Sequence, residues 1–262
     1  MAKIVPLFSS SKGNSFYISG NNEAILVDCG RSCKQIENAL LSNEIDIKTI
    51  KGIFITHEHT DHCSGLRVFA KRYDLPIYAS NGTCKALINS DKVDANAKLN
   101  VIENEIVLGD TLIKRVNTSH DAVESCGYHV TTADNRKCAL VTDTGFLTDE
   151  ALMALKDSNA VIVESNHDIE MLKNGPYPYI LKQRVLSKTG HLSNVDCASV
   201  LPSLITSGVT RLMLAHLSQE NNTVSLALNT SVMALGNALM KRDSDYTITT
   251  APVETNGKNI VF

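Results

Sequence analysis

The segment His57-Glu58-His59-Thr60-Asp61-His62 directly follows the apolar run GIFIT at residues 52–56. Such a run predicts a buried strand, and the end of a strand can aim alternate residues at one point. Imidazole and carboxylate groups are suitable ligands for zinc, manganese and iron(II). Four such groups in six residues exceed the need of one tetrahedral ion with an open position, so the segment predicts two ions. The alternative is a polar loop that caps a helix. We favour the metals because four titratable groups this close repel one another when charged.

Other polar residues also follow apolar, strand-like runs of the chain. They are Asp28, His120, Asp143, His167 and His216. Open α/β sheets gather their sites at strand ends, where the loops can converge. A lone histidine after a strand is more often structural than a ligand. Together with residues 57–62, however, the order of these positions predicts that His120, Asp143 and His216 complete two metal shells.

The composition is that of an ordinary globular protein. The 262 residues are 43% hydrophobic and 20% charged, with a net charge of −3, and a chain of this size can bury a substantial core. The net charge excludes a global basic field but not a local basic patch for nucleic acid. Seven cysteines without a framework spacing predict a reduced, cytoplasmic protein. The chain lacks both the apolar run of a signal peptide and an apolar stretch of about 18 residues, so we expect no membrane association.

Strand and helix patterns alternate along the whole chain without a linker, repeat or low-complexity segment. This pattern predicts one α/β domain over residues 1–262. Strands are expected at residues 3–8, 15–19, 24–28, 52–56, 76–80, 111–119, 161–165 and 211–215, and a hairpin around 134–135 adds two more. Helices are expected at residues 32–43, 64–73, 148–156, 178–188, 194–207 and 222–241. The SSSKGN stretch (9–14) is expected to be a polar loop.

The ordered polar residues resemble the motifs of the metallo-β-lactamase superfamily. These motifs are carried by Asp28, HEHTDH (57–62), His120, Asp143 and His216. The resemblance implies a four-layer αβ/βα sandwich with the site along one edge of its two sheets. It also implies that one ion binds His57, His59 and His120, that the other binds Asp61, His62 and His216, and that Asp143 bridges both. Asp28 would orient ligands through hydrogen bonds, as outer carboxylates usually do.

The C-terminal third narrows the resemblance. The stretches Glu164-Ser-Asn-His-Asp168, Gly190-His-Leu-Ser-Asn194 and Leu214-Ala-His-Leu-Ser218 resemble the YycJ (WalJ) family. The SSSKGNS segment (9–15) is similar to the glycine-containing opening of that family. No spare segment between Asp143 and His216 could hold the inserted β-CASP domain of related nucleases. The resemblance therefore implies a cytoplasmic 5′-to-3′ exodeoxyribonuclease without that insert, acting on DNA with 5′-phosphorylated ends.

The chemistry of phosphodiester hydrolysis gives roles to two residues. Two divalent ions could supply a bridging hydroxide and clamp the phosphoryl group. Asp61 could both bind an ion and accept the proton of the attacking water, and His191 could protonate the leaving oxygen. His191 could instead belong to a polar loop before a helix, with Ser193 or Asn194 as the N-cap; both interpretations can hold. Nitrogen and oxygen ligands admit zinc or manganese, with iron(II) as a third option.

A further group of residues is expected to flank the site or contact the substrate. His167 and Asp168 follow a predicted strand and either flank the site or form a structural turn. Lys182 and Arg184 could contact phosphates, although a solvated helix face is the simpler interpretation. Ser193 could assist them if it is not only an N-cap. The Lys12–Asn14 loop could offer backbone donors to a phosphate.

Two other functions stay open on the sequence. One is hydrolysis of small phosphodiesters, thioesters or lactones by the same metal site. The other is a non-catalytic regulatory module that keeps its metals, and a complete ligand set argues against it. An assay of the purified protein on DNA, RNA and a small diester separates these hypotheses.

Overall fold

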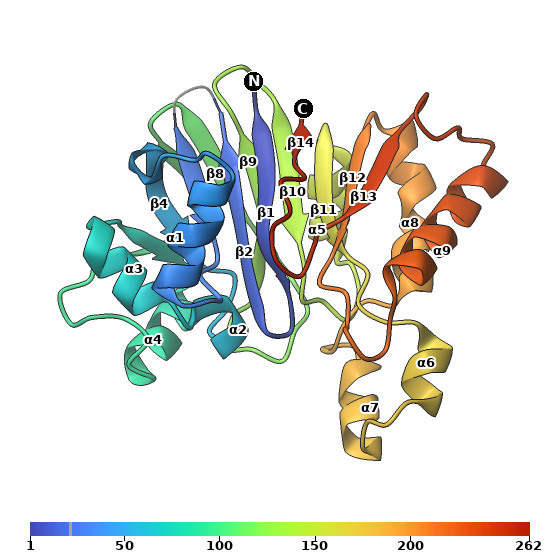
Figure 1. Cartoon of the computed structure of the whole chain (residues 1–262), viewed down its shortest axis with the longest axis horizontal. Helices are drawn as coiled ribbons and strands as arrows, with labels where there is room; N and C mark the ends of the chain where they lie inside the picture. The colour runs from blue at the N-terminus through green and yellow to red at the C-terminus, as the bar shows by residue number, and fades with distance from the viewer. Residues whose placement is uncertain (21–22) are drawn as a thin grey trace.

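Two seven-stranded sheets pack face to face in the computed structural model, which describes residues 1–20 and 23–262 (Figure 1). The first sheet contains, in spatial order, β14 (Ile260–Val261), β1 (Lys3–Ser10), β2 (Gly13–Ser19), β3 (Ala24–Val27), β4 (Ile50–Phe54), β5 (Ile77–Ala79) and β6 (Leu99–Val101). The second contains β13 (Thr247–Thr250), β12 (Arg211–Ala215), β11 (Ala160–Glu164), β10 (Lys137–Val141), β9 (Cys126–Thr131), β8 (Thr111–Asn117) and β7 (Glu105–Leu108). Both sheets are mixed, since each joins an antiparallel part to a parallel part.

Helices cover the outer faces of both sheets. The first sheet is accompanied by α1 (Cys33–Ser42), the 3-10 turn η1 (Ile47–Thr49), the short α2 (Thr60–Cys63), α3 (Leu66–Tyr73) and α4 (Asn81–Asn89). The second sheet is accompanied by α5 (Asp149–Lys156), α8 (Asn194–Thr206) and α9 (Val224–Asn237). Two further helices, α6 (Ile169–Asn174) and α7 (Tyr179–Val185), project from the sandwich near one end (Figure 1).

Three hydrophobic cores hold the four layers together, one between the sheets and one under each helical layer. Strand β11 shows how the sequence encodes this arrangement. Its Val161 and Val163 pack under the helices, whereas Ala160 and Ile162 face the other sheet. Because successive side chains point to opposite faces, a strand buried on both sides must be apolar throughout. The fold class expected from the sequence, a four-layer αβ/βα sandwich, is confirmed.

Some expected elements differ from those in the structure. The SSSKGN stretch is not simply a loop, because β1 runs to Ser10 and β2 begins at Gly13. Ser9, Ser10 and Asn14 of this stretch are buried. Ser9 finds a partner across the fold, because its Oγ accepts a hydrogen bond from the backbone N–H of His216 at 2.8 Å. The helix expected at 64–73 is α3, which begins at Leu66. The short α2, which precedes it, was not expected. At Gly65, between the two helices, a Cβ atom would lie 1.9 Å from the carbonyl oxygen of Arg31. The sequence did not reveal η1, α4, α6, β6, β7, β13 and β14.

No helix in residues 1–20 and 23–262 combines the length and the hydropathy needed to cross a membrane.

Candidate metal centre

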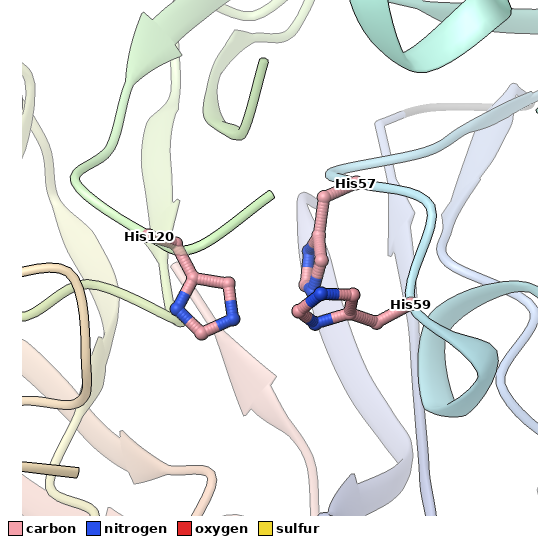
Figure 2. A group of neighbouring side chains, drawn as sticks. All are labelled: His57, His59 and His120. Atoms are coloured by element: carbon pink, nitrogen blue, oxygen red, sulfur yellow. The ribbon is translucent and has the colours of Figure 1, made fainter. Parts of the chain in front are cut away.

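The segment 57–62 leaves β4 and delivers its histidines to the edge where both sheets end. His57 and His59 have ring centroids 4.6 Å apart, and His120, which follows β8, lies 5.0 Å from the first and 5.1 Å from the second. The three side chains come from two separate loops and approach one another (Figure 2). Their ligand atoms lie within 4.8 Å of one another, a spacing that could hold a metal ion.

A second group adjoins the first. It is formed by Asp61, His62 and His216, whose ligand atoms again lie within 4.8 Å of one another. The ring of His62 lies 4.0 Å from that of His57, so the two groups are neighbours. Asp143 connects them, because it also falls within 4.8 Å of the ligand atoms of His57 and His62. Its Oδ2 atom lies 3.5 Å from His62 Nε2.

The backbone at three strand ends turns these side chains into the site. Asp28 after β3, Asp143 after β10 and His216 after β12 have φ values of 63°, 54° and 54°. A left-handed conformation is uncommon for residues other than glycine and costs about 1–3 kcal/mol unless the surroundings impose it. All three residues are buried. The strain is thus concentrated where the strands present their polar side chains.

Three buried atoms at the centre have no hydrogen-bond partner among the residues that the structure describes. They are Nε2 of His57, Oδ2 of Asp143 and Nε2 of His216. Leaving a buried polar atom without a partner costs about 1–3 kcal/mol, and native structures rarely do so. The unpaired atoms belong to the groups described above, and imidazole nitrogen and carboxylate oxygen are the donors that divalent transition metals accept. The donor set therefore fits metal ions, and the adjacent His/Asp groups suggest a dinuclear site.

Asp28 contacts the second group through a hydrogen bond with His62. Its carboxylate accepts hydrogen bonds from the backbone N–H of Thr56 at 2.9 Å and from Nδ1 of His62 at 2.8 Å. Because Nδ1 carries the proton, Nε2 of His62 is left with its lone pair toward the site. Burial raises the pKa of Asp28, although the neighbouring His62 opposes this shift. Asp28 thus lies beside His62, one of the residues expected to bind a metal ion.

Asn14 joins the site from the β1–β2 hairpin. Its Nδ2 atom lies 3.4 Å from Asp61 Oδ2 and 3.0 Å from His62 Nε2. The hairpin can approach because Gly30 lies between it and the 57–62 segment: a Cβ atom at Gly30 would lie 1.7 Å from the Asp61 carbonyl oxygen.

Glu164 is a site residue to which the sequence had assigned no role. It ends β11, is fully buried, and accepts hydrogen bonds from Nδ1 of both His191 and His216 at 2.8 Å. Burial raises the pKa of Glu164. The charge and hydrogen bond of His191 and the hydrogen bond of His216 have a larger, opposite effect, so the pKa lies below its usual range. The signal was available, because Glu164 is an acidic residue at the end of an apolar run, like Asp28 and Asp143. The strand was expected to continue to residue 165, which placed Glu164 inside it.

His191 lies between the two groups. Its ring centroid is 5.0 Å from that of His120 and 5.2 Å from that of His216. The side chain is 17% exposed, so it can reach a bound molecule while Glu164 fixes its orientation. The helix expected to follow is also present, and Ser193 is the N-cap of α8, with its side chain accepting a hydrogen bond from the N–H of Asp196.

An open groove of about 710 Å³ runs beside the two groups. His59, Thr60 and Asp61 line it, and the cationic side chains on its walls are Lys92 and Arg184. Arg184 forms two hydrogen bonds with Asp121, the neighbour of His120 in sequence. Lys92 Nζ donates to Thr60 Oγ1 at 3.2 Å. A charged, extended molecule could thus lie against the metal groups.

The comparisons with known proteins agree with this geometry. The sequence model of the metallo-beta-lactamase superfamily matches residues 11–181. The chain is 39% identical to exodeoxyribonuclease YycJ of Bacillus anthracis, over 91% of this chain and 94% of that protein. It is 36% identical to exodeoxyribonuclease WalJ of Streptococcus pneumoniae, over 92% of this chain and 91% of that protein. The chain belongs to the YycJ/WalJ family of the metallo-beta-lactamase superfamily.

A solved structure shows the same fold. YhfI, a metallo-beta-lactamase fold protein from Bacillus subtilis, matches with a TM-score of 0.71 at 17% identity, covering 99% of this chain and 98% of its own. The superfamily consists of metal-dependent hydrolases, so the expected enzyme class is confirmed.

The remaining candidate residues lie outside the two groups. His167 is buried after β11, and neither of its ring nitrogens has a hydrogen-bond partner within residues 1–20 and 23–262. Asp168 is the N-cap of α6, with its side chain accepting from the N–H of Met171. Lys182 donates from Nζ to the carbonyl oxygen of Lys173 at 2.7 Å, which directs it toward α6. Of the two basic residues proposed for phosphate contact, Arg184 is the one that lines the groove.

Proposed function

We propose that this chain is an exodeoxyribonuclease that uses two divalent metal ions and degrades DNA from the 5′ end. The observation that carries the proposal is the pair of adjacent His/Asp groups beside an open groove with cationic side chains on its walls. The relatives named exodeoxyribonuclease YycJ and WalJ support DNA as the substrate.

In this proposal the six residues of the two groups, together with Asp143, are the metal ligands. One ion is held by His57, His59 and His120, the other by Asp61, His62 and His216, with Asp143 between them. The ligand atoms suit zinc or manganese, and also iron(II). When bound, such ions would activate a water molecule and neutralise charge on the phosphoryl oxygens.

Two side chains of the site would handle protons. Burial raises the pKa of Asp61, but the opposing effect of His62 and His216 is larger and holds the pKa below its ordinary range. The carboxylate is therefore ionised at neutral pH, as both a metal ligand and an acceptor for the proton of the attacking water must be. His191 would donate a proton from Nε2 to the leaving oxygen, while its Nδ1 is bound to Glu164. The carboxylate of Glu164 would stabilise the protonated imidazole and keep it in position.

The groove gives a physical basis for binding a nucleic acid strand. Lys92 and Arg184 stand where phosphates of a strand lying along the groove would pass, and phosphate contacts of this kind position a nucleic acid irrespective of its sequence. One of these cations would hold the terminal 5′-phosphate. Binding should then weaken as salt is added, because phosphate contacts release counterions.

We further propose that the protein acts in the cytoplasm. All seven cysteines are buried free thiols, a state that a reducing compartment maintains.

The proposal is tested by supplying the metal-loaded protein with 5′-phosphorylated single- and double-stranded DNA, RNA and bis(p-nitrophenyl) phosphate. We expect a 5′ label on DNA to appear at once in mononucleotides, and a 3′ label to pass through progressively shorter fragments. Asp61→Ala should be inactive. An enzyme that ignores DNA but rapidly hydrolyses a thioester or lactone would refute the nuclease proposal and leave the metal site standing.

The groove is tested by a double variant. Lys92→Ala with Arg184→Ala should weaken DNA cleavage while sparing bis(p-nitrophenyl) phosphate, which is too small to reach beyond the metals. Lys34→Ala on α1 removes another exposed lysine and serves as the control. Equal DNA cleavage by the double variant and the control would exclude the groove as the binding path.

A further inference from the structure

Helices α6 and α7 form an arm that projects from the sandwich (Figure 1). Leu172 and Val185 are the buried residues of these two helices. The bond from Lys182 Nζ to the carbonyl oxygen of Lys173 joins α7 to the end of α6. The arm is therefore an ordered part of the fold rather than a loose loop.

The first turn of α7 exposes two large side chains. Tyr179 is 75% exposed and Ile180 is 82% exposed. Removing apolar surface from water is favourable by about 25 cal/mol per Å², so side chains of this size gain nothing for folding by standing in solvent. They are placed on a projection, where no neighbouring element of the sandwich can cover them. Because the two residues are adjacent, they form one apolar surface that another molecule could cover.

The position of α7 points to the molecule that occupies the groove. Arg184 of this helix lines the groove together with Asp61. Ile180 precedes Arg184 by four residues, so the two side chains share one face of the helix, one turn apart. A strand that leaves the groove past Arg184 would next meet Ile180 and Tyr179.

The charge of the arm favours a polyanion. Residues 168–190 contain the four basic residues Lys173, Lys182, Arg184 and Lys188, against the two acidic residues Asp168 and Glu170. This segment is therefore net positive in a chain whose overall charge is −3. Exposed aromatic and apolar side chains beside cations are the means by which proteins bind single strands, with bases packed on the side chains and phosphates on the cations.

We propose that the α6–α7 arm binds the unpaired nucleotides next to the one being cut, with Tyr179 and Ile180 packed against their bases. This inference rests on the proposed nuclease function, since it assigns a second contact surface to the same substrate. The competing occupant of such a surface is a second copy of the chain.

The test is binding of a fluorescein-labelled single-stranded oligonucleotide, followed by anisotropy in the absence of cleavage. Tyr179→Ala with Ile180→Ala should weaken binding by about tenfold, the usual effect of losing one base-stacking contact. Tyr179→Trp should keep wild-type affinity. Hydrolysis of bis(p-nitrophenyl) phosphate should be the same in all variants. Leu239→Ala, which removes an 88% exposed leucine elsewhere, is the matched control.

Unchanged DNA binding by the double alanine variant would overturn the inference. So would a dimer of the wild-type protein, seen by sedimentation, that the double variant dissociates, because the surface would then serve self-association. The proposed function fails separately, if the wild-type protein does not cleave DNA whatever its affinity for the oligonucleotide.

Discussion

Replacing Glu164 by glutamine should disrupt the hydrogen bonds that orient His191 and His216 in the site. Its Oε1 atom accepts both histidine bonds, from Nδ1 of His191 and of His216 at 2.8 Å. Its Oε2 atom accepts two backbone N–H groups, from Thr144 at 2.9 Å and from Leu192 at 3.1 Å. A glutamine of the same shape has one acceptor oxygen, so its NH₂ group must face two donors in either orientation.

The two orientations have different consequences. If the NH₂ group faces the backbone, two fixed N–H donors oppose it. If it faces the histidines, each must move its proton from Nδ1 to Nε2, and Nε2 of His216 can then no longer bind a metal. Losing a buried, charge-assisted hydrogen-bond network of this kind should lower the free energy of unfolding by about 3–5 kcal/mol. Losing an outer-shell partner should weaken metal binding at the His216 group by about 10–100-fold.

The assay is calorimetric titration of the apo-protein with zinc or manganese, accompanied by urea unfolding. One binding step should weaken in Glu164→Gln while the step assigned to His57, His59 and His120 keeps its affinity. Glu37→Gln, which changes a carboxylate that accepts from Arg72 and Tyr73 instead, should leave both steps unchanged. Two unaltered binding steps and full turnover in Glu164→Gln would refute the orienting role.

Three other perturbations give distinct outcomes. His191→Ala should keep both metals but slow a substrate with a poor leaving group by about 10²–10⁴-fold, and affect a p-nitrophenyl ester far less; equal losses on the two substrates, measured as kcat, would mean that His191 only positions the substrate. Chelation of the metals should lower the melting temperature, since bound ligands stabilise the folded state. The apo-protein should still show the far-ultraviolet circular dichroism spectrum of a folded protein, because the three cores need no metal. A random-coil spectrum would contradict this. Burial lowers the pKa of His167 to about 4, whereas the unfolded value is about 6.5, so the unfolded state takes up the proton first and stability falls as the pH drops below about 6.5. Between pH 8 and pH 5 this loss should amount to about 2 kcal/mol in urea unfolding and should be absent from His167→Leu; parallel pH profiles for the two proteins would exclude it.

The parts of this site that depend on local sequence patterns could be predicted from the sequence. Apolar runs that end in Asp28, His57, Asp143 and His216 marked strands buried on both faces, and the order of the polar residues predicted their convergence. The structure brings these residues together. The alternation of strands and helices predicted an α/β domain, and the four-layer sandwich was implied by the resemblance to the metallo-β-lactamase superfamily.

Features set by distant partners escaped prediction. Ser9 and Asn14 have the composition of a loop, yet they lie in buried strands because their side chains contact His216 and Asp61. Glu164 ends an apolar run as Asp28 and Asp143 do, but the local pattern could not show its role, because its partners are histidines 27 and 52 residues further along the chain. The left-handed backbone at the three strand ends is likewise imposed by the assembled site, since aspartate and histidine do not prefer it strongly enough to reveal it locally.

The dinuclear metal site is tested most directly by anomalous diffraction from crystals of the metal-loaded protein, recorded at the absorption edge of the bound metal. We expect two ions per chain, about 3.5–4 Å apart, one beside His57, His59 and His120, the other beside Asp61, His62 and His216. Asp143 should contact both. A single ion in fully loaded protein, or two ions without Asp143 between them, would contradict the account.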